Sequence, residues 1–168
     1  MSRVRELIDN LGLAPHPERG YYVETYRAPL TTGQLPPPHS GARAASTAIY
    51  FLVTREEPTT YLHRLLSDEM FHFYEGGPLD VLLLAPTGPG EVRRLGTDVA
   101  AGERPQLLIR AGTWFATELA DPAASHCLIG CTVAPGFEFA DFELAEGAEL
   151  AARYPVHAAR IARMTRPA

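Results

Sequence analysis

Residues 59–77 read TTYLHRLLSDEMFHFYEGG, and this stretch is the most informative about both fold and chemistry. Apolar and polar residues alternate along 60–65 and 69–74, and alternation places successive side chains on opposite faces of a β-strand. Two histidines, His63 and His72, and the acidic Glu69 lie among these strand-forming residues. A His or Glu on the inner face of a β-sandwich must be paired, liganded or neutralised, because an uncompensated buried charge is costly. We therefore expect two strands here, with a functional site beside them.

Further short runs of strand-forming residues follow, separated by turns rich in Gly and Pro. Many short strands at this spacing are typical of an all-β sandwich, jelly roll or barrel. Helices are predicted at residues 2–11, which carry an apolar stripe, and in the Ala- and Arg-rich end from about residue 147. Residues 29–45 are predicted to form a loop. The predicted strands are 21–26, 47–53, 60–65, 69–74, 79–84, 91–95, 106–110, 114–118, 127–133 and 138–144.

Length and composition indicate one globular domain over residues 1–168. We divide it into an N-terminal helix, strand and loop (1–45), a β-barrel core (46–144) and a helical tail (145–168). The formal net charge is −5 without a basic stripe, so nucleic acid is not an expected partner. No apolar run approaches the roughly 20 residues that span a bilayer, and the first residues lack the apolar core of a signal peptide. We expect a cytoplasmic protein that does not contact membranes.

The site hypothesis centres on His63 and Glu69. If both point inward from neighbouring strands, they form a base–carboxylate pair or part of a metal site. Phe71 and Phe73 share the face of Glu69 and would line an apolar pocket, with Trp114 or Phe115 from across the barrel. Structural interpretations remain open: His63 as a core histidine, Glu69 as a rim carboxylate, His72 on the outer face, and Tyr74 as packing. The other histidines named here, His16, His39 and His157, are expected to be exposed.

Four blocks of the sequence, in order, resemble the DUF985 group of the cupin superfamily: LIDNLGLAPHPERGYYVETYRA, STAIYFLVTREEPTTYLHRLLSDEMFHFYEGGPLDVLLL, GERPQLLIRAGTWFATEL and LIGCTVAPGFEFADFELA. This resemblance implies a double-stranded β-helix, or cupin jelly roll, similar in shape to the dTDP-sugar 3,5-epimerases. It also implies a homodimer, for which the strand at 21–26 is a natural donor to a neighbour's sheet edge.

The metal motifs of cupins are incomplete in this chain. Glu69 and Gly76 keep the expected Glu-to-Gly spacing, but His63 is the only histidine on the preceding strand, and Phe115 stands at the position of the third His ligand. Two ligands, His63 and Glu69, are too few for a tight transition-metal site. The resemblance therefore implies no metal and no other cofactor.

The favoured hypothesis is a metal-independent isomerase or epimerase that acts next to a carbonyl. His63 is the base, Glu69 orients it, and a tyrosine returns the proton. Tyr74 is included among the catalytic residues, but Tyr22, Tyr50 and Tyr61 are equally candidates for this acid. Val23 replaces an arginine that is usual in the group, so the small-molecule ligand is expected to be less acidic than those of relatives. The alternatives are a non-catalytic binding cupin and a metal-dependent cupin oxygenase. The predicted ligand-binding residues are Tyr22, Tyr50, Tyr61, Arg64, Phe71, His72, Phe73, Trp114 and Phe115.

Overall fold

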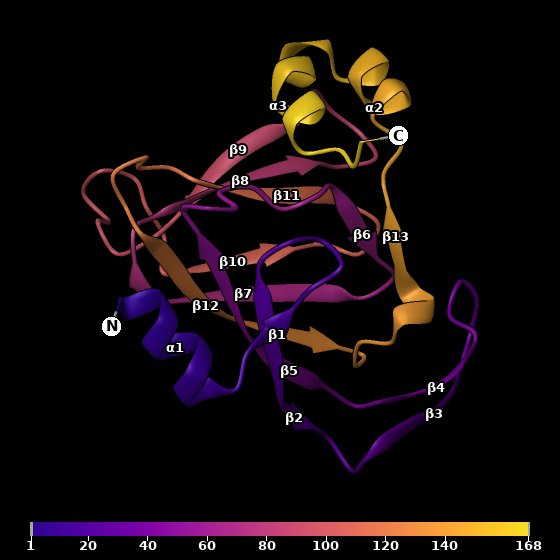
Figure 1. Cartoon of the computed structure of the whole chain (residues 1–168). Helices are drawn as coiled ribbons and strands as arrows, with labels where there is room; N and C mark the ends of the chain where they lie inside the picture. Colours follow the sequence, from indigo (N-terminus) through magenta and orange to yellow (C-terminus); the bar gives the residue numbers. More distant parts are fainter. Residues whose placement is uncertain (1, 168) are drawn as a thin grey trace.

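Two facing antiparallel sheets form the body of the protein, and helices from both ends of the chain cover their outer faces (Figure 1). The computed structural model describes residues 2–167. The six-stranded sheet has the order β1-β2-β5-β12-β7-β10 and the five-stranded sheet the order β13-β6-β11-β8-β9. The strands are β1 Ala14–Pro15, β2 Tyr21–Arg27, β3 Thr31–Leu35, β4 Gly41–Ala44, β5 Thr47–Thr54, β6 His63–Leu65, β7 Asp68–Gly76, β8 Leu79–Leu84, β9 Glu91–Leu95, β10 Gln106–Ile109, β11 Trp114–Leu119, β12 His126–Ala134 and β13 Phe142–Leu144. The predicted all-β class with terminal helices is confirmed.

The N-terminal helix α1 (Arg3–Leu11) covers the outer face of the six-stranded sheet. Its first turn is capped by the Ser2 hydroxyl, which accepts a hydrogen bond from the Arg5 amide, and it ends at Gly12 in the left-handed conformation. Its apolar stripe, with Leu7 buried, packs on Leu52 and Leu128 of the sheet. The predicted amphipathic helix is thus held by a matching apolar strip.

The main core fills the space between the sheets, and a second cluster lies under the C-terminal helices α2 (Gly147–Arg153) and α3 (Ala158–Arg163). Strand β8 shows why two clusters are needed, because every residue in it is buried. Val81 and Leu83 face the inter-sheet core, whereas Leu82 and Leu84 face the C-terminal helices. In Figure 1 these helices, drawn in yellow, lie over β8 and β11.

Several segments differ from the sequence predictions. The predicted loop at 29–45 contains the β3–β4 hairpin, and only residues 142–144 of the predicted strand 138–144 are β, because Phe139–Asp141 forms the 3₁₀ turn η1. Residues 60–62 belong to no strand, because their amides donate to carbonyls of three separate segments. The C-terminal tail is interrupted at Pro155, which begins the 3₁₀ turn η2 (Pro155–His157).

The turn between β6 and β7 determines where the candidate site forms. Leu66 and Ser67 carry the chain from the five-stranded sheet to the six-stranded sheet. His63 and Glu69 therefore lie on facing sheets, and the expectation that they sit on neighbouring strands was wrong.

Within residues 2–167, no helix is long and apolar enough to cross a membrane.

Candidate functional site

A cavity of about 150 Å³ opens between the two sheets, at the end where η1 lies against the β3–β4 hairpin. An apolar cavity of roughly the same volume admits a benzene molecule. Most of its wall is aromatic or aliphatic, with a few convergent polar groups, as in small-molecule sites. The lining residues are His16, Glu18, Tyr22, Glu24, Arg27, Thr47, Ile49, His63, Leu65, Glu69, Cys131, Val133, Phe137, Glu138, Phe139 and Phe142.

The ring of His63 is buried at the floor of the cavity, with 5% of the residue exposed. Its Nδ1 lies 2.8 Å from the Tyr61 carbonyl oxygen and 2.5 Å from Oε2 of Glu18. Both neighbours are acceptors, so Nδ1 carries a proton and the remaining nitrogen, Nε2, is the one that can act as a base. The ring centroid lies 4.1 Å from that of Phe115 and 5.2 Å from that of Phe142. These contacts fix both the tautomer and the ring plane.

Burial alone would lower the pKa of His63, because a charged imidazolium is poorly solvated there. The charge and hydrogen bonding of Glu18, the Tyr61 carbonyl and the charge of Glu69 outweigh it, so the pKa of His63 is raised. The sequence hypothesis gave the role of orienting carboxylate to Glu69. The structure places Glu18, 45 positions earlier in the chain, at the Nδ1 atom instead.

His16 flanks Glu18 on its other side. Its Nδ1 accepts a hydrogen bond from the Glu18 amide at 3.3 Å, and its ring meets Tyr22 edge-on at a centroid distance of 4.6 Å. Burial lowers the pKa of His16, the charge of Glu18 opposes this, and His63 adds to the lowering. His16 is therefore a neutral wall residue. The expectation that it is exposed was wrong, because only 6% of its side chain is accessible.

Glu69 reaches the same cavity from β7 on the opposite sheet and is 7% exposed. Within residues 2–167 its Oε2 has no hydrogen-bond partner. Burial raises the pKa of Glu69 to about 8, although His63 and a hydrogen bond with Cys131 oppose this and Glu18 contributes to it. At neutral pH Glu69 is therefore mostly a neutral carboxylic acid. The site thus brings together a histidine with a raised pKa and a protonated acid, a combination suited to acid–base chemistry.

A second, smaller void of about 20 Å³, with room for about one water, lies next to the floor of the main cavity. Glu18, His63 and Glu69 separate it from the main cavity, and the Thr60 and Thr117 side chains add hydroxyls to its wall. Phe71 and Phe115 form its apolar part. The two spaces share the lining residues Glu18, Ile49, His63, Glu69 and Cys131, which therefore form the floor of the main cavity.

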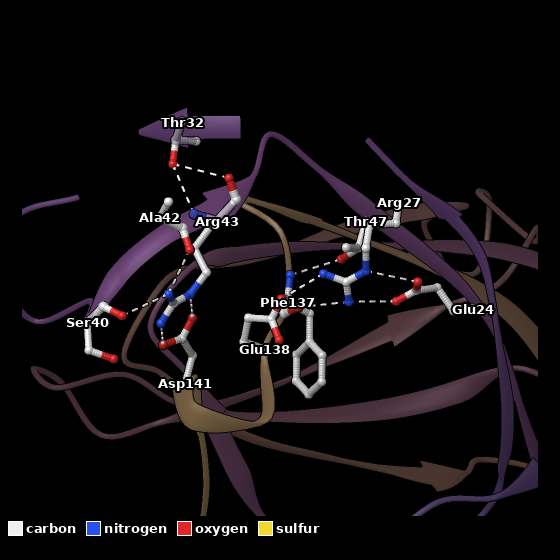
Figure 2. Close-up of polar contacts among 10 residues, drawn as sticks. All are labelled: Glu24, Arg27, Thr32, Ser40, Ala42, Arg43, Thr47, Phe137, Glu138 and Asp141. Carbon is white, nitrogen blue, oxygen red and sulfur yellow. Dashed lines mark hydrogen bonds and ion pairs between the residues drawn. The ribbon is translucent and has the colours of Figure 1, made fainter. Parts of the chain in front are cut away.

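The rim of the cavity is formed by an ion-pair network (Figure 2). Arg27 binds both carboxylate oxygens of Glu24, at 3.0 and 2.8 Å, and Oε1 of Glu138 at 2.7 Å. Beside it, the buried Arg43 holds Asp141 of η1 through two hydrogen bonds of 2.7 and 2.6 Å. Together these contacts fix the segment that carries Phe137 and Phe139 over the opening.

The structure brings three of the predicted site residues to the cavity or its inner void besides His63 and Glu69. Tyr22 lines the main cavity, and Phe71 and Phe115 line the void. Phe73 packs against the inter-sheet core nearby.

The other predicted site residues lie elsewhere. Alternation along β7 turns His72 and Tyr74 to the outer face of the six-stranded sheet, where His72 bonds Thr132 and Tyr74 is 51% exposed. Placing Tyr74 in the active site was therefore a wrong prediction of geometry. Four more predicted residues are also outside the cavity: Tyr50 lies beneath α1, Trp114 and Arg64 lie together on the outer face of the other sheet, and Tyr61 lies beneath Arg19.

Sequence reasoning missed Glu18, His16 and the rim residues. The signal for the first two was the string His16-Pro17-Glu18 within the N-terminal block. The same reasoning expected His39 and His157 to be exposed, but both are half-buried.

The donor set does not fit the metal centre of other cupins. Within residues 2–167, no group of three His, Cys, Asp or Glu side chains is arranged to hold a metal ion. His63 commits Nδ1 to Tyr61 and Glu18, and a phenyl ring, Phe115, packs against its imidazole. The described residues therefore do not reproduce the ligand set expected from the resemblance.

Comparison with known proteins places this fold in a family. The family model described as Cupin superfamily (DUF985) matches residues 5–145. An uncharacterized protein of Saccharomyces cerevisiae, YML079W, is 30% identical over 155 residues, which cover 87% of this chain and 77% of that protein.

Solved structures agree. Protein SO0799 from Shewanella oneidensis is 36% identical, with a TM-score of 0.86 and complete coverage of both chains. A hypothetical protein from Leishmania major is 33% identical, with a TM-score of 0.87 over 99% of this chain and 100% of that one. Oxalate decarboxylase from Bacillus subtilis, at 13% identity and a TM-score of 0.53, shares the fold alone, over 90% of this chain and 37% of that one. The double-stranded β-helix is thus confirmed, and the chain belongs to the DUF985 family of the cupin superfamily.

Proposed function

We propose that the cavity is the active site of a metal-independent isomerase or epimerase that acts on a carbon next to a carbonyl. The observation that supports it best is the arrangement of His63: Nδ1 is tied to Glu18 and the Tyr61 carbonyl, while the cavity also holds Glu69 from the opposite sheet. A base with a raised pKa and a protonated acid on facing walls are the two groups that such a reaction needs.

In this reaction Nε2 of His63 removes the proton from the carbon, and the electron pair left on carbon moves into the carbonyl to give an enolate. Glu18 stabilises the imidazolium that forms, as a carboxylate behind a catalytic histidine does. Glu69 delivers its proton to the carbon from the opposite face, which inverts the centre. Proton transfer from His63 to Glu69 then restores both groups. Tyr22, which lies in the cavity wall, is the candidate to hold the carbonyl oxygen.

Exchange of the carbon-bound proton with solvent tests this proposal. The protein is incubated in D₂O with small ketones such as hydroxyacetone and aminoacetone, and loss of the α-proton signal is followed by NMR. We expect exchange above the buffer rate, reduced at least about a hundredfold in His63→Gln. His72→Gln is the matched control, because His72 lies on the outer face of the sheet. Equal exchange by wild type and His63→Gln would contradict the proposal.

A non-catalytic binding cupin is the second candidate. It is favoured by the mostly apolar wall and by the hydrogen bond that ties His63 to a backbone carbonyl. The same experiment separates the two functions. Ligand binding detected by chemical-shift changes of cavity residues, without exchange for any carbonyl compound that binds, would support the binding function.

A further inference from the structure

Carboxyl groups are the most numerous ionisable groups of the cavity wall. Among the lining residues, all within 2–167, four are glutamates and one, Arg27, is a permanent cation. Four of the five N–H groups of Arg27 are engaged: Nε and Nη2 bind Glu24, Nη1 binds Glu138, and Nη2 also donates to the Phe137 carbonyl at 3.3 Å (Figure 2). An anionic ligand would have to compete with two carboxylates for this guanidinium, so the wall offers it little.

Two glutamates remain buried in the floor after the rim pairs are set aside. Glu18 and Glu69 are each 7% exposed, and the Oε2 atom of Glu69 has no hydrogen-bond partner within residues 2–167. A buried acceptor without a partner is costly unless a bound group supplies a donor. The floor therefore presents a carboxyl oxygen without an internal partner to whatever occupies the cavity.

The wall also contains a corner of three aromatic rings, Phe137, Phe139 and Phe142, all lining the cavity. Their planes are nearly perpendicular in every pair, at 79°, 73° and 72°, and their centroids are 5.0 to 6.4 Å apart. Rings set at right angles form the walls of an aromatic box, the arrangement that recognises ammonium groups.

We infer that this cavity takes a small organic cation, an amine or quaternary ammonium compound, held between the aromatic corner and the glutamates of its wall. The inference deepens the proposed function, on which it rests for the reaction itself, by naming the charge class of the substrate. A carbonyl compound that carries an ammonium group would fit both the proposed reaction and this charge class. Val23 packs beneath α1 on the outer face of the sheet, so the sequence argument that linked it to the charge of the ligand does not apply to this cavity.

Three ligands of the same shape and different charge test the inference: choline, 3,3-dimethylbutan-1-ol and 3,3-dimethylbutanoate. Their dissociation constants are measured by NMR titration of the wild-type protein. We expect choline to bind about tenfold more tightly than the neutral alcohol, and the carboxylate to bind most weakly. Equal or tighter binding of the alcohol or the carboxylate, or no binding of choline at the cavity, would overturn the inference.

Two variants locate the binding. Phe139→Leu removes a half-exposed ring of the corner and should weaken choline binding several-fold, with a smaller effect on binding of the neutral alcohol. Tyr74→Leu removes an aromatic ring outside the cavity and should leave the affinities for choline and for the alcohol unchanged.

A second cavity variant tests the role of Glu69. In the wild-type protein, choline affinity should increase between pH 6.5 and 8.5, because Glu69 loses its proton over this range. This increase should be smaller in Glu69→Gln. The groups facing Glu69 are His63 from β6, Glu18 from the β1–β2 loop and Cys131 from β12. Unchanged choline affinity in both cavity variants would contradict this site.

The two proposals fail separately, because choline has no carbonyl group. Tight choline binding without proton exchange on any carbonyl compound would retain the cation site and remove the isomerase. Proton exchange on hydroxyacetone without selective binding of choline would retain the isomerase and remove the cation site.

Discussion

At the scale of single residues, the site depends on two buried glutamates in different settings. Glu18 contacts Nδ1 of His63, whereas Glu69 is buried without a partner for Oε2 within the described part of the chain, and its pKa is raised to about 8. Alternation along the sequence correctly separated Glu69, Phe71 and Phe73 from Met70, His72 and Tyr74. It could not reveal Glu18, because nothing local indicates that a loop residue will reach a histidine 45 positions away.

The pH dependence of stability should reveal Glu69. In the folded protein it binds its proton up to about pH 8, whereas in the unfolded chain it loses it near 4.5. The folded state therefore holds more protons between these values, and the free energy of unfolding falls as pH rises through them. Glu69→Gln should match wild type near pH 5 and exceed it at pH 8.5 by an amount on the order of a few kcal/mol. Urea unfolding at both pH values measures this.

The raised pKa of His63 acts in the same direction, since its stabilising contribution is present below pH 6.5 and is lost as pH rises through the folded value. The contribution of His63 remains in Glu69→Gln, so part of the fall in the free energy of unfolding at alkaline pH should persist in that variant. Glu143→Gln, at an exposed glutamate paired with Arg64, is the control and should follow wild type. Identical pH profiles for Glu69→Gln and wild type would contradict the assigned protonation of Glu69.

Catalysis should show a bell-shaped pH profile. His63 must be neutral to accept a proton, and Glu69 must be protonated to donate one, so kcat/KM should fall on the acid side and again near pH 8. The alkaline fall should disappear in Glu69→Gln, along with most of the activity. An unchanged alkaline limb in that variant would assign the acid to another group, for which Tyr22→Phe is the next test.

At the scale of elements, the cavity depends on how two loops are held at one end of the sandwich. The β3–β4 hairpin carries Arg43 and η1 carries Asp141, and both side chains are about 95% buried. Their ion pair is supported by the carbonyls of Ser40 and Ala42, which accept from Nη1 of Arg43 (Figure 2). This contact holds the segment that carries Phe139 in place at the cavity rim.

Breaking this pair should loosen the rim and lower stability. Arg43→Met leaves the Asp141 carboxylate buried without its partner, which is the costly way to remove an ion pair. We expect a clear drop in melting temperature by calorimetry and weaker ligand binding. Arg110→Met is the matched control, because its pair with Asp68 is exposed and contributes little. A loss no larger than that of the control would contradict this role of Arg43.

At the scale of the whole molecule, the facing sheets determine which ligand chemistry is available. His63 and Glu69 come from opposite sheets, and the position of a third metal ligand carries Phe115. We therefore expect purified protein, loaded with iron, nickel, manganese or zinc, to hold well below one equivalent after desalting. Elemental analysis measures this. Near-stoichiometric metal that is lost in His63→Ala would contradict it.

Assembly is also a property of the whole molecule, and a homodimer remains a prediction. Strand β1 pairs with Tyr21 and Tyr22 of β2, and β5 pairs with the other side of β2. Within residues 2–167, the rest of β2 therefore has no ladder partner on the side away from β5. Tyr26 on this edge is 53% exposed. Light scattering should give about twice the chain mass of 18.3 kDa, and Tyr26→Asp should shift it toward the monomer. A monomer in wild type would contradict the prediction.

The sequence by itself determined most of the strands, the helix at the N-terminus and the inner face of β7, because alternation and turn residues are local signals. It also determined the family, and it singled out His63 and Glu69. Only the tertiary structure decided that these two residues face each other from different sheets, that Glu18 supports His63, and that Tyr74 lies outside. Those relations depend on strand order and on a turn that changes sheets, and they join residues far apart in the chain, which no local pattern encodes.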